Sequence, residues 1–238
     1  MADYILVHGA WHGAWCWENI VPGLKAAGHN VRAIDLPGHG DDHSPVSEMT
    51  LENNARTIAA AVSAADGPVV LVGHSMGGMS ITQAAELVPE QLEKLVYLTA
   101  FLPADGQSLP DLAANDQGTL VLPNLIPDEA TGTCVVAEDA RREAFYNDCG
   151  DYDFGRALAR MCPESLAAVG APVSITAERN GSVPRIYIEC TRDQAISITR
   201  QREMHAARPC EQVLTIETDH SPFYSEVDEL TAILLGVA

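Results

Sequence analysis

Basic residues are scarce in this sequence. Lys25 and Lys94 are the only lysines, and 14 basic side chains stand against 33 acidic ones, which gives a formal net charge of −19. Because such a surface repels phosphate backbones, we expect no nucleic-acid partner. The same charge disfavours anionic membranes and slows the approach of anionic substrates, and its simplest interpretation is solubility.

Patterns typical of disulfide frameworks and metal sites are also missing. The six cysteines contain no Cys-x-x-Cys pair and are scattered along the chain: Cys16, Cys134, Cys149, Cys162, Cys190 and Cys210. We therefore expect free thiols, several of them buried, and no zinc site. His8 and His12 have a spacing that a metal could use, but they lie in a predicted loop without an accompanying carboxylate, so we expect no metal there.

Long apolar runs are lacking as well. No stretch of 18 apolar residues occurs, and the N-terminal MADYILVHGA has neither the basic start nor the apolar run of a signal peptide. We therefore expect a soluble, cytoplasmic protein with no membrane partner. The chain has 238 residues, 47 % of them hydrophobic, which is enough to bury the core of one large α/β domain.

The sequence does contain an alternation of strand and helix patterns. Short apolar runs predict strands at 4–7, 30–34, 69–72, 92–98, 185–190 and 212–216. Helical spacing predicts helices at 15–27, 51–64, 76–87, 196–206 and 222–237. The run VVLV at 69–72 has no polar alternation, which is typical of a strand buried on both faces. This order predicts an α/β fold with a parallel sheet and helices on both faces.

The alternation stops in the middle of the chain. From Pro103 to Pro184 the sequence has 13 acidic residues against 5 arginines and no lysine. We expect helices at 138–147 and 154–161, joined by loops rich in proline, glycine and aspartate. Because the segment leaves after one strand and returns to the next, we expect residues 103–184 to form a cap on a single domain whose core is 1–102 and 185–238. The cap should cover the carboxyl ends of the strands, where such sheets bind ligands.

A nucleophile motif follows the third predicted strand. The segment Gly73-His74-Ser75-Met76-Gly77 is a complete Gly-x-Ser-x-Gly, with a predicted strand before it and a predicted helix after it. The glycines leave room for a tight turn that exposes the Ser75 hydroxyl, and the helix N-terminus directs N–H groups at the site. We predict that Ser75 is a nucleophile rather than an incidental serine in a glycine-rich turn.

A serine hydroxyl needs an adjacent base, and the base needs an orienting acid. In folds of this type the chain order is serine, acid, histidine. Asp193 follows the strand at 185–190 and His220 follows the strand at 212–216, so both should lie at the same edge of the sheet as Ser75. Asp219 is a rival acid, but it is adjacent to His220, and adjacent side chains usually diverge. We therefore predict the triad Ser75, Asp193 and His220.

The oxyanion hole requires two N–H donors. We predict Met76, directly after the nucleophile, and Ala10, in the loop after the first strand. Several residues are candidates for substrate contact, although each aromatic among them is equally compatible with core packing: Trp11, His12, Phe101, Phe145, Tyr146 and Phe223. Of the remaining histidines, we expect structural roles for His8 and His74 and loop or surface positions for His29, His39, His43 and His205.

Several of these segments together resemble one family. LVHGAWHGAWCW, DLPGHG, VVLVGHSMGG, YIECTRD and DHSPFYS are similar to segments of plant methylesterases and hydroxynitrile lyases, which are α/β-hydrolases with bacterial esterase relatives. The resemblance extends along the core and is weak in the cap. It implies a mostly parallel six-stranded sheet, a small helical cap, a Ser-Asp-His triad, no cofactor and, often, a homodimer. Matched position by position, it implies the same triad, Ser75, Asp193 and His220, and the same donors, Ala10 and Met76.

The lyase branch of this family departs from the sequence at two positions. Those enzymes have a lysine directly after the catalytic histidine and a threonine after the first-strand histidine, whereas Ser221 and Gly9 stand here, and no lysine follows Lys94. Without that cation, departing cyanide loses its electrostatic stabilisation. We therefore expect a serine carboxylesterase that cleaves small to medium, hydrophobic or aryl esters through an acyl-enzyme.

Other chemistry is compatible with the same scaffold. The alternatives are hydroxynitrile cleavage, hydrolysis of carbamates, amides or lactones, C–C bond hydrolysis and cofactor-independent oxygenation. A non-catalytic binding protein that keeps only the pocket is a third class, although such a receptor has no need of all three triad residues.

Overall fold

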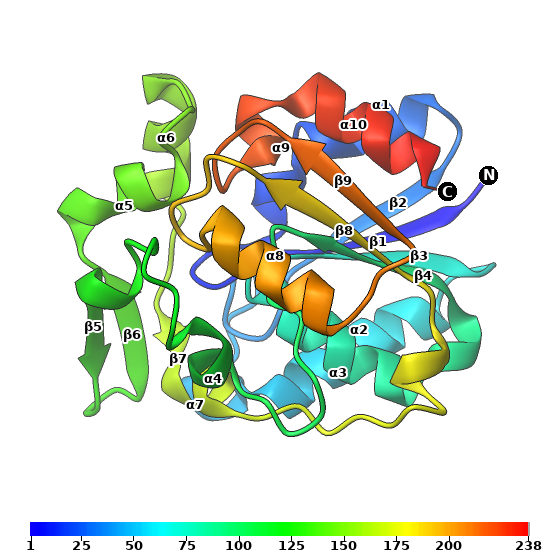
Figure 1. Ribbon diagram of the computed structural model, residues 1–238, viewed down its shortest axis with the longest axis horizontal. Helices are drawn as coiled ribbons and strands as arrows, with labels where there is room; N and C mark the ends of the chain where they lie inside the picture. The colour runs from blue at the N-terminus through cyan, green and yellow to red at the C-terminus, as the bar shows by residue number, and fades with distance from the viewer. Residues whose placement is uncertain (238) are drawn as a thin grey trace.

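Six parallel strands form the central layer of the computed structural model, which describes residues 1–237 (Figure 1). The strands are β1 (Asp3–Val7), β2 (Asn30–Ile34), β3 (Val69–His74), β4 (Leu92–Leu98), β8 (Arg185–Cys190) and β9 (Gln212–Ile216). Their spatial order is β2-β1-β3-β4-β8-β9, and every neighbouring pair is parallel. The predicted α/β fold with a six-stranded parallel sheet is confirmed, and all residues of the central strand β3 are buried, as its unbroken apolar run indicated.

Helices cover both faces of this sheet. On one face α1 (Ile20–Ala26) and α10 (Val227–Gly236) pack over Tyr4 and Leu6 of β1. On the other, α2 (Leu51–Ser63), α3 (Gly77–Leu87) and α8 (Ile198–Ala207) contribute to the buried cluster that contains Ile5 and Val7. Successive side chains of a strand point to opposite faces, so one apolar strand supplies both buried clusters.

Two predicted helices are interrupted in the structure. The segment predicted at 15–27 forms a 3₁₀ turn, Ala14–Trp17, before α1, and the segment predicted at 222–237 forms α9 (Pro222–Ser225) before α10. Pro22 explains the late start of α1, because proline is tolerated in the first turn of a helix and not in its interior. Glu226 separates α9 from α10 with φ −139° and ψ 55°, which is not helical.

Residues 103–184, which we call the cap segment, contain strands as well as helices. The helices are α4 (Leu109–Ala113), α5 (Glu138–Phe145), α6 (Asp151–Leu158) and α7 (Leu166–Gly170). The strands β5 (Leu125–Asp128), β6 (Thr133–Val136) and β7 (Glu164–Ser165) form a small antiparallel sheet. The expected helical cap did not include this sheet, because strands of two to four residues are too short for an alternating pattern to show.

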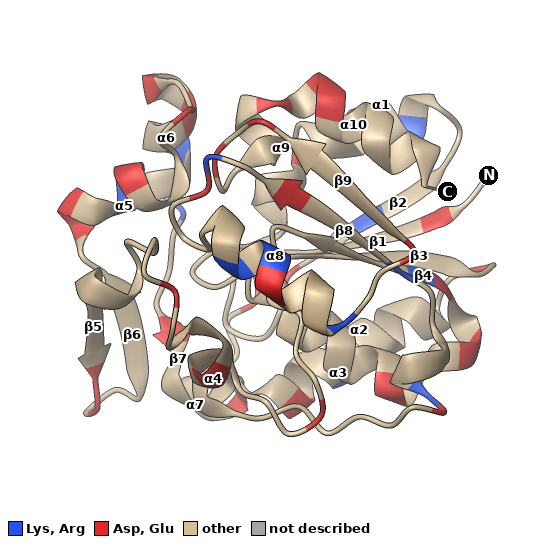
Figure 2. Ribbon diagram, viewed as in Figure 1, with Lys and Arg blue, Asp and Glu red and all other residues tan. Residues whose placement is uncertain are grey.

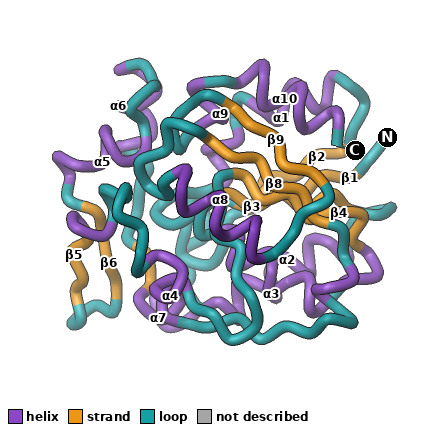
Figure 3. The backbone as a smooth tube through the Cα atoms, viewed as in Figure 1, coloured by secondary structure: helices purple, strands orange, loops and turns teal. Residues whose placement is uncertain are grey.

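The cap segment lies at one end of the core. Figure 3 shows that loops, drawn in teal, lie between the strands of the large sheet and the elements of the cap segment. These loops follow the carboxyl ends of the strands, which is where ligands of parallel sheets bind. The predicted nucleophile, acid and base all follow strand ends at this edge.

The acidic excess is distributed rather than concentrated. Figure 2 shows Asp and Glu on α5 and α6 of the cap segment and on α10 of the core. All six cysteines are free, and four of them are buried, as expected from their scattered spacing. No helix within residues 1–237 has the length and apolar character needed to cross a membrane.

Candidate active site

Ser75 lies on a tight turn between β3 and α3. Its φ of 55° is in the left-handed region, which a residue other than glycine seldom adopts. Two glycines make the turn possible through close backbone contacts. A Cβ on Gly77 would come within 2.6 Å of the carbonyl oxygen of His8, and a Cβ on Gly73 within 2.8 Å of the carbonyl oxygen of Gly77. The strand–turn–helix that the Gly-x-Ser-x-Gly motif predicts is therefore present.

The side chains of Asp193 and His220 contact each other in a buried environment. Nδ1 of His220 is 2.6 Å from Oδ2 of Asp193, and the two residues follow the neighbouring strands β8 and β9. Because the imidazole nitrogen that faces a carboxylate carries the proton, Nε2 of His220 is left as the basic nitrogen. The turn that holds Ser75 is tied to this pair, since Nε2 of His74 donates a hydrogen bond of 2.8 Å to the carbonyl oxygen of His220.

Further donors orient the Asp193 carboxylate. Its Oδ1 accepts from the backbone N–H of Ala195 at 2.6 Å and of Ile196 at 2.9 Å. Its Oδ2 accepts from the hydroxyl of Thr99 and, at 3.4 Å, from Nε2 of Gln201. The sequence did not reveal Thr99 or Gln201, although Thr99 directly follows β4, at the edge of the sheet where the triad residues lie. In the structure Thr99 has an unusual φ of 36°. Together these donors stabilise the negative charge beside His220.

Asp219, the rival acid, is engaged elsewhere. It is buried, and burial raises the pKa of its carboxyl group. The carboxylate accepts four hydrogen bonds, two from the cap segment, one from the loop after β9 and one from α9: from Asp148 N, Cys149 Sγ, Ser221 N and Ser225 Oγ. Asp219 thus ties the turn after α5 to the loop that carries His220, while Asp193 contacts the imidazole.

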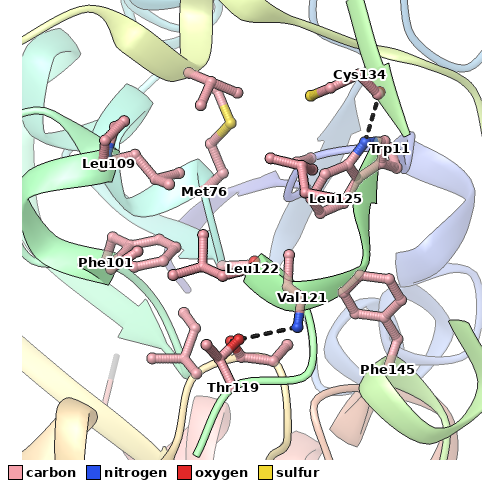
Figure 4. A pocket seen from close by; sticks show the side chains of 17 residues that line it. Trp11, Met76, Phe101, Leu109, Thr119, Val121, Leu122, Leu125, Cys134 and Phe145 are labelled. Atoms are coloured by element: carbon pink, nitrogen blue, oxygen red, sulfur yellow. Dashed lines mark hydrogen bonds between the residues drawn. The ribbon is translucent and has the colours of Figure 1, made fainter. Parts of the chain in front are cut away.

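An apolar cavity of about 240 Å³ opens beside Ser75 (Figure 4). It lies between the strand ends and the cap segment, and both predicted oxyanion donors, Ala10 and Met76, line it. Among the 17 lining residues of the described chain none is charged, and only Ser75 and Thr119 are polar. The hydroxyl of Thr119 is already occupied, because it donates to the carbonyl oxygen of Ala195 at 2.8 Å and accepts from the N–H of Val121 at 3.0 Å.

Three of the six candidates for substrate contact line this cavity: Trp11, Phe101 and Phe145. The other three, His12, Tyr146 and Phe223, are buried and do not line it.

His12 and Tyr146 form a hydrogen bond with each other and do not line the cavity. Nδ1 of His12 donates to the carbonyl oxygen of Ala10 at 2.7 Å, and Nε2 accepts from the hydroxyl of Tyr146 at 2.5 Å. Burial lowers the pKa of His12 to about 4, so its ring is neutral at pH 7. Phe223 packs at 5.6 Å from the ring of Trp17 and at 5.0 Å from that of His74.

The histidines outside the triad have structural environments, with one departure from expectation. Burial lowers the pKa values of His8 and His74, in line with the structural roles expected of them. His39 lies in a loop, as one of the two expectations had it, but it is buried, with Nε2 3.0 Å from Oε2 of Glu164 on β7. The cap segment covers His39, and this contact across 125 residues leaves no local trace in the sequence.

The chain is similar to known α/β-hydrolases over almost its whole length. Residues 4–233 match the family model described as "Alpha/beta hydrolase family". Methylesterase 9 of Arabidopsis thaliana is 32 % identical over 253 residues, which cover 100 % of this chain and 98 % of that protein. Salicylic acid-binding protein 2 of Nicotiana tabacum is 32 % identical over 250 residues, which cover 99 % of this chain and 96 % of that protein.

Solved structures show the same relationship. A pyrethroid hydrolase from Sphingobium faniae JZ-2 has a TM-score of 0.89 and 29 % identity, with 99 % of this chain and 96 % of that chain covered. Polyneuridine aldehyde esterase has a TM-score of 0.88 and 27 % identity, with 100 % and 99 % covered. The resemblance to plant methylesterases and bacterial esterases is thereby confirmed. The chain belongs to the α/β-hydrolase family, as a methylesterase-like member homologous to carboxylic ester hydrolases.

Proposed function

We propose that this protein is a serine carboxylesterase that cleaves uncharged esters carrying a hydrophobic or aryl group. The observation that carries the proposal is the buried contact between Asp193 and His220 at the strand edge where Ser75 lines an apolar cavity. The names of relatives, which include a methylesterase, polyneuridine aldehyde esterase and a pyrethroid hydrolase, support hydrolysis of esters.

The proposed reaction begins when Oγ of Ser75 attacks the carbonyl carbon of the ester while Nε2 of His220 accepts its proton. Asp193 keeps Nδ1 of His220 protonated and stabilises the imidazolium that forms. The backbone N–H groups of Ala10 and Met76 stabilise the negative oxygen of the tetrahedral intermediate, and loss of one such donor lowers turnover by about 10²–10³.

The intermediate collapses as His220 returns the proton to the departing alcohol oxygen, which leaves an acyl-enzyme on Ser75. A water molecule then attacks the acyl carbon, with His220 again as the base, and releases the acid. Every step uses side chains and backbone groups of this chain.

The cavity limits which group the substrate can carry. A cavity of about 150 Å³ holds one benzene molecule, so 240 Å³ scales to a group of about nine or ten carbon atoms. A charged group would lose its hydration there without gaining a partner, because no lining residue of the described chain is charged. We therefore propose small to medium esters with an uncharged alkyl or aryl part.

Cyanohydrin cleavage is less favoured than ester hydrolysis. The residue after His220 is Ser221, which is buried and carries no charge. Lys94 donates to the carbonyl oxygen of Val237, near the C-terminus of the described chain, so it does not supply a cation beside Ser75.

A panel of p-nitrophenyl esters from acetate to hexadecanoate tests the proposal. We expect hydrolysis by the wild type, with kcat/KM highest for acyl chains that the cavity can hold and much lower for longer chains and for acyl groups ending in a carboxylate. Ser75→Ala should be inactive, and Ser80→Ala, which removes another buried serine hydroxyl on α3, should keep its activity. Inactivity of the wild type on the whole panel, or hydrolysis that survives Ser75→Ala, would contradict the proposal.

A further inference from the structure

Trp11 connects the loop after β1 to the cap segment. Its φ is 63°, which is a rare and strained conformation for a bulky side chain. Such a conformation persists only where the surroundings hold it in place, and it commonly marks a functional constraint. The residue directly before it is Ala10, whose backbone N–H is the proposed second donor of the oxyanion hole.

Three separate parts of the cap segment hold Trp11. Its Nε1–H donates to the carbonyl oxygen of Cys134 on β6 at 3.0 Å (Figure 4). Its carbonyl oxygen accepts from the N–H of Cys162, after α6, at 3.0 Å. Its ring packs 5.6 Å from the ring of Phe145 at the end of α5. Trp11 is therefore held at its indole N–H, at its ring and at its backbone carbonyl.

The rest of the loop has little freedom to move. On one side the loop lies directly against Ser75, since a Cβ on Gly9 would lie 2.6 Å from Cβ of Ser75. On the other side His12 donates to the carbonyl oxygen of Ala10 at 2.7 Å and accepts from Tyr146, which directly follows α5, at 2.5 Å. A shift of the cap segment would therefore move the loop relative to Ser75.

We propose that Trp11 is a positioning residue that sets the direction of the Ala10 N–H through its hydrogen bond to the cap segment. A movement of the cap segment would then displace the Ala10 N–H of the oxyanion hole. This inference rests on the proposed function, because the position of the Ala10 N–H matters for turnover only if Ser75 forms a tetrahedral intermediate. An oxyanion donor must lie about 2.7–3.1 Å from the developing charge, so a small displacement is sufficient to weaken it.

The alternative is that Trp11 serves only as an apolar wall of the cavity, which it also lines. Trp11→Phe separates the two roles, because it keeps an aromatic ring in the wall and removes the donor to Cys134. Trp17→Phe is the matched control. Trp17 is buried, and its indole N–H has no hydrogen-bond partner within residues 1–237, so the same exchange there removes an N–H without breaking a bond.

The experiment compares the full-length wild type, Trp11→Phe and Trp17→Phe on p-nitrophenyl butyrate. For Trp11→Phe we expect kcat to fall about 3- to 10-fold, the range that one neutral hydrogen bond supports. KM should change less than about twofold, because a group that acts only in the transition state leaves ground-state binding intact. The inhibition constant of an alkyl trifluoromethyl ketone, which forms an oxyanion on Ser75, should rise by the same factor as kcat falls. The inhibition constant of 2-phenylethanol, which needs only the cavity, should not change. Trp17→Phe should leave kcat, KM and both inhibition constants near their wild-type values.

Two outcomes would overturn the role of Trp11. In the first, folded Trp11→Phe has an unchanged kcat and an unchanged inhibition constant for the ketone. In the second, KM and both inhibition constants rise equally while kcat is unchanged, which would make Trp11 only a wall of the cavity. If Trp11→Phe does not fold, 3-benzothienylalanine at this position keeps the bicyclic shape without the N–H and provides the same test. Absence of Ser75-dependent hydrolysis in the wild type would instead overturn the proposed function itself.

Discussion

Replacing Asp193 with asparagine should disable the proposed base while leaving its side chain in place. Oδ1 of Asp193 accepts from the N–H of Ala195 at 2.6 Å and of Ile196 at 2.9 Å, so the amide oxygen of the asparagine must take that position. Its NH₂ group then faces Nδ1 of His220, which must become the acceptor. Nε2 of His220 consequently carries the proton and cannot accept the one from Ser75.

The expected loss is large because the wrong tautomer removes the base altogether. In another enzyme with a Ser-His-Asp triad the same exchange lowers kcat by about 10⁴. That factor corresponds to about 5.4 kcal/mol of activation free energy. We expect a decrease of this order for Asp193→Asn, measured as kcat on p-nitrophenyl acetate with circular dichroism as the test of folding.

Asp219→Asn is the matched control, since it makes the same exchange one residue before His220. Asp219 accepts hydrogen bonds from Asp148 and Ser221, so its loss should lower the free energy of unfolding by about 1–3 kcal/mol. Turnover of the folded variant should stay within about tenfold of the wild type, because Asp219 does not orient the imidazole. A nearly normal kcat in Asp193→Asn together with a severe loss in Asp219→Asn would refute the assignment of the acid.

Three further changes test other parts of the account. Thr99→Val removes a hydroxyl that donates to Asp193, so the protein should lose about 1–2 kcal/mol of stability. Urea unfolding measures this loss, and a stability equal to that of the wild type would contradict the role of Thr99. Ala113→Phe fills part of the cavity and should spare acetate esters while lowering kcat/KM for octanoate esters, and equal effects on both would contradict the proposal that the cavity holds the apolar part of the substrate. Glu164→Gln removes the partner of His39. Burial lowers the pKa of His39, but the hydrogen bond to Glu164 and its charge raise this pKa by more, so the net pKa lies above the ordinary 6.5. Because the folded-state pKa lies above the unfolded one, the stabilisation is complete below the unfolded pKa and is lost as pH rises through the folded pKa. Urea unfolding should therefore show a larger penalty at about pH 6 than at about pH 9, and a penalty independent of pH would contradict the ion pair.

The core could be predicted from the sequence because its signals are local. Buried parallel strands appear as unbroken apolar runs, and the turn at Ser75 appears as spaced glycines after such a run. The pairing of Asp193 with His220 was also accessible, because the ends of parallel strands share one edge of the sheet. The structure joins these two side chains at 2.6 Å.

The features that were missed depend on contacts between distant residues. Thr99 reaches Asp193 across 94 positions, and His39 meets Glu164 across 125. His12 is a candidate for substrate contact by sequence, but the hydroxyl of Tyr146, 134 positions away, is the partner of its ring. Long-range partners of this kind decide which way a polar side chain points, and no periodicity records them.

The most direct test of the central claim is the reaction of the folded protein with phenylmethylsulfonyl fluoride, followed by intact mass and peptide mapping. A serine hydroxyl that Nε2 of His220 activates should form a single sulfonyl adduct on Ser75, with parallel loss of esterase activity. Ser75→Ala should form none, and Asp193→Asn should react far more slowly than Asp219→Asn. An unmodified wild type, or an adduct on a residue other than Ser75, would contradict the account.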